Sequence, residues 1–126
     1  MAAALLYMAG VLYISTRPLA AVSGISPAGE TLNNLAHVPA YALLTLLLYL
    51  CLVFFGGGKA SLAFAGLVSF FFGALMEFLQ MWVPGRTASR RDIALNLAGV
   101  LCAAAAVKVY RLIRESPAFR ESSEYV

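Results

Sequence analysis

Residues 60–83 read ASLAFAGLVSFFFGALMEFLQMWV, and this stretch decides the fold class. Glu77 is its single charged residue. An apolar run of about 18 residues or more is long enough to cross the roughly 30 Å hydrocarbon core of a bilayer as a helix. The stretch is therefore predicted to be a membrane-spanning helix.

Three further apolar stretches flank this one, at residues 1–16, 35–55 and 93–113. The first is at the lower length limit for a span, and no basic residue precedes it as in a signal peptide, so we expect a retained short helix. Glycine, proline and charged residues separate the stretches: Arg17-Pro18, Gly56-Gly57-Gly58-Lys59, Pro84-Gly85 and Arg90-Arg91-Asp92.

These boundaries predict an all-α fold, a polytopic membrane four-helix bundle. The bundle occupies residues 1–114, with its third helix at 60–83, and a polar C-terminal tail follows over 115–126. Composition agrees, because 62% of the 126 residues are hydrophobic and 12% are charged. A soluble domain is about 45–50% apolar and about 25% charged, and one this small could not bury so much apolar surface.

Neither the charge nor the cysteines indicate another class of protein. The net charge of +3 is small and does not suggest a nucleic-acid partner. Cys51 and Cys102 lie in two different apolar stretches, at depths too far apart for a disulfide. We expect both to be free thiols buried as small hydrophobic side chains.

Successive spans must alternate direction, because backbone groups left unpaired in hydrocarbon are costly and each span must be a complete helix. The two termini and the Gly56–Lys59 turn then share one face. That face has slightly more basic residues than the other: Lys59, Lys108, Arg111, Arg114 and Arg120 against Arg17, Arg86, Arg90 and Arg91. The positive-inside rule predicts a multi-pass membrane protein with both termini in the cytoplasm.

Six polar side chains interrupt the spans near the opposite, extracytoplasmic face: His37, Tyr41, Glu77, Gln80, Asp92 and Asn96. They form three pairs spaced by three or four residues, so each pair lies on one face of its helix. Gly73 and Gly99 continue two of these faces and would let the helices approach closely. We predict one shallow polar pocket, covered by Arg86 and Ser89 from the loop before the fourth helix.

Most of these residues also have a purely structural interpretation. Ser89-x-x-Asp92 fits the capping pattern of a helix N-terminus. His37 could be an interfacial histidine, and Tyr41 could belong to an aromatic belt. The two amide side chains could serve as hydrogen-bonding contacts between helices: Gln80 and Asn96.

Glu77 is the hardest to explain by structure alone. A carboxylate within an apolar span is costly, must face the bundle interior, and must be protonated or have a partner. Arg86 and His37 are candidate partners. One histidine with two acids is a thin basis for a metal site, so we expect no metal and no cofactor.

The polar positions resemble a known family. Glu77-x-x-Gln80, Val83-Pro84-Gly85-Arg86 and Ser89-x-x-Asp92-x-x-x-Asn96-x-x-Gly99, with His37-x-x-x-Tyr41 upstream, are similar to the signature of the VanZ-like family of small bacterial membrane proteins. The resemblance covers residues 33–103. It implies a multi-helix membrane domain in the bacterial inner (cytoplasmic) membrane, in a family named for a protein that raises resistance to the lipoglycopeptide teicoplanin.

Three functions are compatible with this pattern. The first is recognition of an amphiphile of the cell envelope, in which Arg86 with Arg90 or Arg91 pairs with phosphate or carboxylate. The ligand would be an anionic lipid, a lipid-linked envelope precursor or a lipoglycopeptide. The second is a hydrolase or phosphatase acting on a lipid, with general acid and base among His37, Glu77 and Asp92. The third is a small proton-coupled exporter, although such sites usually lie at the bilayer midplane.

Overall fold

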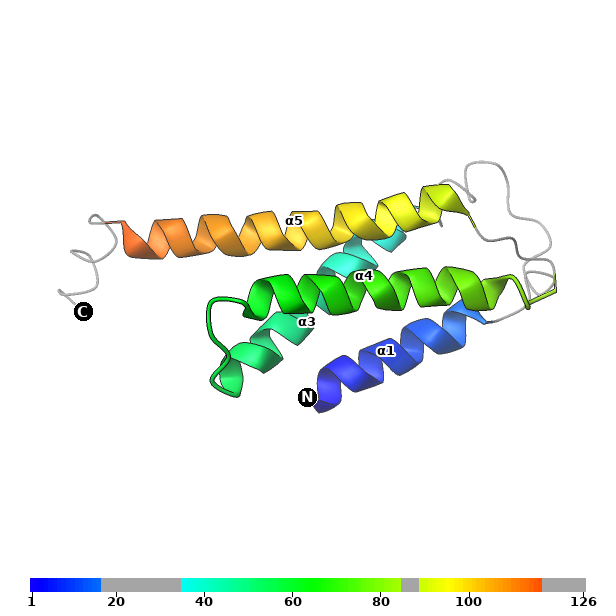
Figure 1. The fold of residues 1–126 in the computed structure, drawn as a ribbon, viewed down its shortest axis with the longest axis horizontal. Helices are drawn as coiled ribbons and strands as arrows, with labels where there is room; N and C mark the ends of the chain where they lie inside the picture. Colours follow the sequence, from blue (N-terminus) through cyan, green and yellow to red (C-terminus); the bar gives the residue numbers. More distant parts are fainter. Residues whose placement is uncertain (17–34, 85–88, 117–126) are drawn as a thin grey trace.

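The computed structural model describes residues 1–16, 35–84 and 89–116 (Figure 1). Within these ranges the chain forms four helices and no strand: α1 (Ala2–Ser15), α3 (His37–Phe54), α4 (Ser61–Gln80) and α5 (Arg90–Glu115). Three of them, α3, α4 and α5, are long and apolar enough to cross a membrane. The prediction of an all-α membrane bundle is thus confirmed.

The first helix is shorter than expected. α1 has 14 residues, about 21 Å at 1.5 Å per residue, whereas a spanning helix needs about 20 residues. Within the described part of the chain, length and composition therefore identify α3, α4 and α5, but not α1, as candidate spans. Most of the tail predicted over 115–126 lies outside the described residues, as do Arg17, Arg86 and Arg120.

The ends of α4 and α5 also differ from the sequence prediction. Helical structure in α4 stops at Gln80, and the next three residues form tighter turns in which each amide bonds the carbonyl three residues earlier. Pro84 explains this early end, because a proline disfavours helical backbone just before it. α5 begins at Arg90, three residues earlier than expected, because Ser89 caps it. Its 26 residues give a length of about 39 Å, so it extends past the α3–α4 turn (Figure 1).

The turn between α3 and α4 is set by glycine. Gly56 has a φ of 81°, in the left-handed region that favours a residue without a Cβ. Its amide donates to the carbonyl of Val53 at 3.0 Å, and the amide of Gly57 donates to that of Leu52 at 2.8 Å. This pair of bonds is a Schellman motif, which satisfies the last carbonyls of α3 and reverses the chain.

α3 packs against both α4 and α5, which also pack against each other, while α1 packs against α3 and α4. The buried face of α4 repeats every four residues in mostly small side chains: Ser61, Ala65, Ser69, Gly73 and Glu77. Small residues let membrane helices approach closely. Phe64, Phe71 and Phe78 are exposed on the outer surface of the same helix, which is the surface that faces lipid.

The cysteines are free, as predicted, but the prediction that both are buried is wrong. Cys102 is exposed on the outer face of α5, and Cys51 is half-buried. The interior of the bundle contains polar as well as apolar side chains: among the described residues, four of the five largest fully buried side chains are those of Glu77, Asn96, Thr45 and Ser69. Apolar lipid outside the bundle removes the usual need to turn hydrophobic side chains inward.

Gly99 and Gly73 lie at tight contacts between helices. A Cβ at Gly99 would collide with the backbone carbonyl of Val38 in α3. A Cβ at Gly73 would lie 2.7 Å from the side-chain amide nitrogen of Asn96 and 2.9 Å from the ring of Tyr41. Any side chain at either position would therefore separate the helices that carry the polar residues.

We expect Gly99→Ala to destabilise the bundle by about 1–3 kcal/mol, the cost of overpacking a tight contact. Gly10→Ala is the matched control, because a Cβ there meets nothing within 4 Å. The control should be neutral or stabilising by up to about 1 kcal/mol, since alanine favours helix over glycine. Thermal unfolding of the two variants in mild detergent checks this, and equal melting temperatures would contradict the assigned crossing.

Candidate functional site

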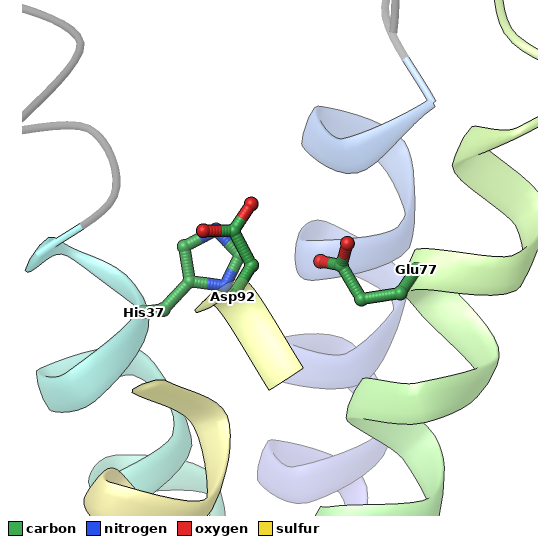
Figure 2. A group of neighbouring side chains, drawn as sticks. All are labelled: His37, Glu77 and Asp92. Atoms are coloured by element: carbon green, nitrogen blue, oxygen red, sulfur yellow. The ribbon is translucent and has the colours of Figure 1, made fainter. Parts of the chain in front are cut away.

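Three chemically reactive side chains meet at one end of the bundle. The start of α3, the end of α4 and the start of α5 lie at this end (Figure 1). They carry His37, Glu77 and Asp92, and one nitrogen or oxygen atom from each residue lies within 4.8 Å of the others. Figure 2 shows the carboxylate of Glu77 pointing toward His37 and Asp92. We call these three residues the acidic cluster.

Glu77 is held by the residue that caps the start of the next helix. Its side chain is 1% exposed. The backbone amide of Ser89, the N-cap of α5, donates to Oε2 of Glu77 at 3.1 Å. The N-terminal end of a helix carries a partial positive charge that favours a carboxylate. Sequence reasoning proposed Arg86 or His37 as the partner and missed this backbone group, which has no sequence signature; Arg86 itself lies outside the described residues.

The capping interaction at Ser89 is only half of a capping box. The hydroxyl of Ser89 accepts from the amide of Asp92 at 3.4 Å, so its predicted capping role is confirmed. In a full capping box the acidic residue at the third helical position would accept from the N-cap amide in return. Glu77 of α4 accepts from that amide instead. Oδ1 of Asp92 is buried with no hydrogen-bond partner among the described residues.

Asn96 fixes the orientation of the histidine. Its Oδ1 lies 2.8 Å from Nδ1 of His37, and its side chain is 1% exposed. An amide oxygen only accepts, so Nδ1 of His37 carries the proton and donates. The other ring nitrogen, Nε2, then holds a lone pair for binding a proton or a ligand.

Tyr41 and Gln80 complete the polar surroundings. The Tyr41 ring stacks on that of His37, with ring centroids 6.2 Å apart and planes 15° apart. Tyr41 is buried, which argues against the aromatic-belt interpretation, because belt residues face the membrane interface. Gln80 is also buried. The structure thus brings the six predicted polar side chains to one end of the bundle, with Ser89 at the same end.

A groove of about 470 Å³ runs along α1 and reaches the acidic cluster. It lies between α1, α3 and α4, and its lining combines apolar residues with polar members of the site: Tyr7, Gly10, His37, Tyr41, Met76 and Gln80. The hydroxyl of Tyr7 donates to the carbonyl of Ala40 at 3.1 Å, which holds α1 in place as one wall. The volume is typical of sites for small ligands.

A larger hollow of about 890 Å³ lies at the other end, between α3 and α5. Arg111 and Tyr49 line it, and the guanidinium of Arg111 donates to the hydroxyl of Tyr49 at 2.9 Å. No member of the acidic cluster lines this hollow, so the chemistry of the described residues is concentrated at the first end.

A family model matches the chain over residues 4–113, and its description is VanZ/LLP1. The chain belongs to the VanZ/LLP1 family. The family resemblance expected from the motif is therefore confirmed, and the matched region includes α3, α4 and every member of the acidic cluster. No curated protein and no solved structure matches the chain.

We expect Glu77→Ala to destabilise this VanZ/LLP1 protein by about 2 kcal/mol or more, because it removes a hydrogen bond to a charged group and leaves the Ser89 amide unsatisfied. Glu77→Gln keeps an oxygen acceptor and should cost less. Glu115→Ala, at the exposed end of α5, is the control and should change stability by less than about 0.5 kcal/mol. Unfolding of purified proteins in detergent measures all three, and equal losses for Glu77→Ala and Glu115→Ala would contradict the assigned contact.

Proposed function

We propose that this protein binds an amphiphile of the bacterial envelope at the extracytoplasmic face of the cytoplasmic membrane. The ligand class is an anionic lipid, a lipid-linked envelope precursor, or a lipoglycopeptide of the teicoplanin type. The observation that carries the proposal is a partly buried polar cluster that adjoins a mostly apolar groove. An amphiphile has this same combination of a polar headgroup joined to an apolar chain.

The groove and the cluster would bind different parts of the ligand. The headgroup would contact His37 and Gln80, which lie on the groove wall and offer hydrogen-bonding groups. The chain would lie along α1 beside Met76 and Gly10, where apolar contact favours a hydrocarbon. Such a division is common, because ligand sites are mostly apolar with a few convergent polar groups that fix orientation.

Basic residues beside the cluster support an anionic headgroup. Arg90 and Arg91 are exposed in the first turn of α5, and the sequence places Arg86 in the preceding loop. A basic residue near a membrane surface attracts anionic lipid by about 1 kcal/mol. An arginine can also bind phosphate or carboxylate through two parallel hydrogen bonds.

Hydrolysis of a lipid is the second candidate. His37 supports it, because a histidine held at Nδ1 by Asn96 and placed among two carboxylates resembles a general base. Binding and hydrolysis differ in one observable: hydrolysis forms a product that accumulates with time and is absent from a His37→Ala variant.

Occupation of the groove is tested with variants of α1. Gly10→Leu should fill the groove and weaken binding of phosphatidylglycerol or teicoplanin at least about tenfold, since a leucine side chain would occupy the space of the chain. Ala9→Leu, on the exposed side of the same helix, is the control. Arg86→Ala and Glu77→Gln test the headgroup end, with phosphatidylcholine as the reference lipid.

Native mass spectrometry of the folded variants measures retained ligand and any product. Binding that is unchanged in Gly10→Leu, Arg86→Ala and Glu77→Gln alike would refute the proposed site. A product that depends on His37 would favour the second candidate over binding alone.

The same proposal places the C-terminal end of α5 and the α3–α4 turn on the cytoplasmic side of the membrane. Lys108, Arg111 and Arg114 support this orientation, because they lie near the C-terminal end of α5, away from the cluster. A green fluorescent protein fused after Val126 should fluoresce, and alkaline phosphatase fused after Pro84 should be active. The opposite pattern of reporter activity would invert the orientation and move the site to the cytoplasmic face.

A further inference from the structure

We propose that His37, Glu77 and Asp92 form a binding site for a divalent transition-metal ion of the Zn²⁺ or Mn²⁺ type. The site lies at the end of the bundle where α3, α4 and α5 meet. It has one imidazole and two carboxylates, a mixed nitrogen and oxygen donor set that suits these ions. Three protein ligands leave at least one coordination position open for another molecule.

The three side chains lie close enough together to bind one ion. One ligand atom from each residue lies within 4.8 Å of the others. Donors bind zinc at about 2.0–2.2 Å, so two donors on one ion lie roughly 3–4 Å apart. Binding of one ion would draw the three donor atoms closer together by roughly 1–2 Å. Figure 2 shows the three side chains converging from separate helices.

A hydrogen bond to Asn96 orients the ring of His37 as in a metal-binding histidine. A histidine that binds a metal usually donates its other ring N–H to an oxygen, which fixes the tautomer and the ring orientation. Nδ1 of His37 has this partner in Oδ1 of Asn96, at 2.8 Å. Asn96 is fully buried, and its Nδ2 has no hydrogen-bond partner among the described residues. Among the described residues, the contact with His37 is therefore the one side-chain hydrogen bond of this buried amide.

The two carboxylates bring negative charge to the site, and one of their oxygen atoms accepts no hydrogen bond from the described residues. Asp92 and Glu77 bring two carboxylates to within 4.8 Å of each other, and like charges at this distance repel. A dication between them replaces repulsion with attraction. Oδ1 of Asp92 is buried without a hydrogen-bond partner among the described residues, because Glu77 has taken the amide that a capping box would have given to Asp92.

The ion would also deepen the proposed function. Two carboxylates would repel a phosphate or a carboxylate headgroup, whereas a bound dication with an open position would attract it. This last step rests on the proposed function. Metal binding itself does not, because it needs only the three side chains and is measured without a lipid.

The direct test is metal binding by the full chain in detergent. His37 is the single histidine, so the protein should carry an affinity tag without histidine. After removal of metals with EDTA and dialysis against buffered Zn²⁺, mass spectrometry of metals should find about one zinc per chain. Binding should also raise the melting temperature, because an ion bound only by the folded state stabilises it.

The variants identify the ligands. We expect His37→Gln and Asp92→Asn to weaken Zn²⁺ binding by at least about 100-fold, and Asn96→Leu to weaken it by about 10–100-fold through loss of the outer support. Asn96→Asp keeps the oxygen and should retain most of the affinity. Glu115→Gln is the matched control for loss of a carboxylate and should bind as the wild type does.

Size-exclusion chromatography and circular dichroism verify that each variant is folded. Oδ1 of Asp92 makes no hydrogen bond among the described residues, so Asp92→Asn breaks none at that atom. His37→Gln keeps the test decisive if one variant fails to fold. Co²⁺ absorption adds a spectroscopic signature, since loss of the imidazole should change the spectrum.

Less than about 0.1 zinc per chain, or wild-type affinity in both His37→Gln and Asp92→Asn, would overturn the metal site. Zinc binding without any binding of phosphatidylglycerol or teicoplanin would leave the metal site standing and remove the proposed function. Lipid binding that is unchanged by EDTA would show that headgroup recognition does not require the ion.

Discussion

The hydrogen bond from the backbone of Ser89 to the carboxylate of Glu77 joins the end of α4 to the start of α5, and the chemistry of the site depends on it. A carboxylate inside a membrane bundle needs a partner, and the amide at a helix start supplies one without a second charged side chain. The same bond leaves the carboxylate of Asp92 without its usual capping partner. One contact therefore both stabilises the interior acid and makes a second acid available.

Close packing of the helices then determines the shape of the site. Gly73 and Gly99 allow α4 and α5 to approach α3, and this approach brings Asn96 into contact with His37. Because the interior contains polar groups, each additional ångström between the helices would break hydrogen bonds that no water in the membrane replaces. The contacts among the polar side chains therefore depend on the close packing at the glycines.

Much of this arrangement is predictable from the sequence, because the bilayer restricts the choices. Long apolar runs must be helices, helices joined by short turns must alternate, and residues three or four apart share a face. These rules place His37, Glu77 and Asp92 at one end of the bundle, and the structure has them there. They cannot predict the partner of Glu77, since every residue has a backbone amide. The pairing of His37 with Asn96 depends on the crossing of α3 and α5, which spacing within one helix does not encode.

The length of α5 has a mechanical consequence. Its first turn contributes Asp92 to the cluster, and its last turns extend past the α3–α4 turn at the opposite end (Figure 1). A straight helix of 26 residues behaves as a lever about 39 Å long, so a tilt of about 5° at its start displaces its far end by roughly 3 Å. Any rearrangement around Asp92 that tilted α5 would therefore move its far end sideways on the other side of the bilayer.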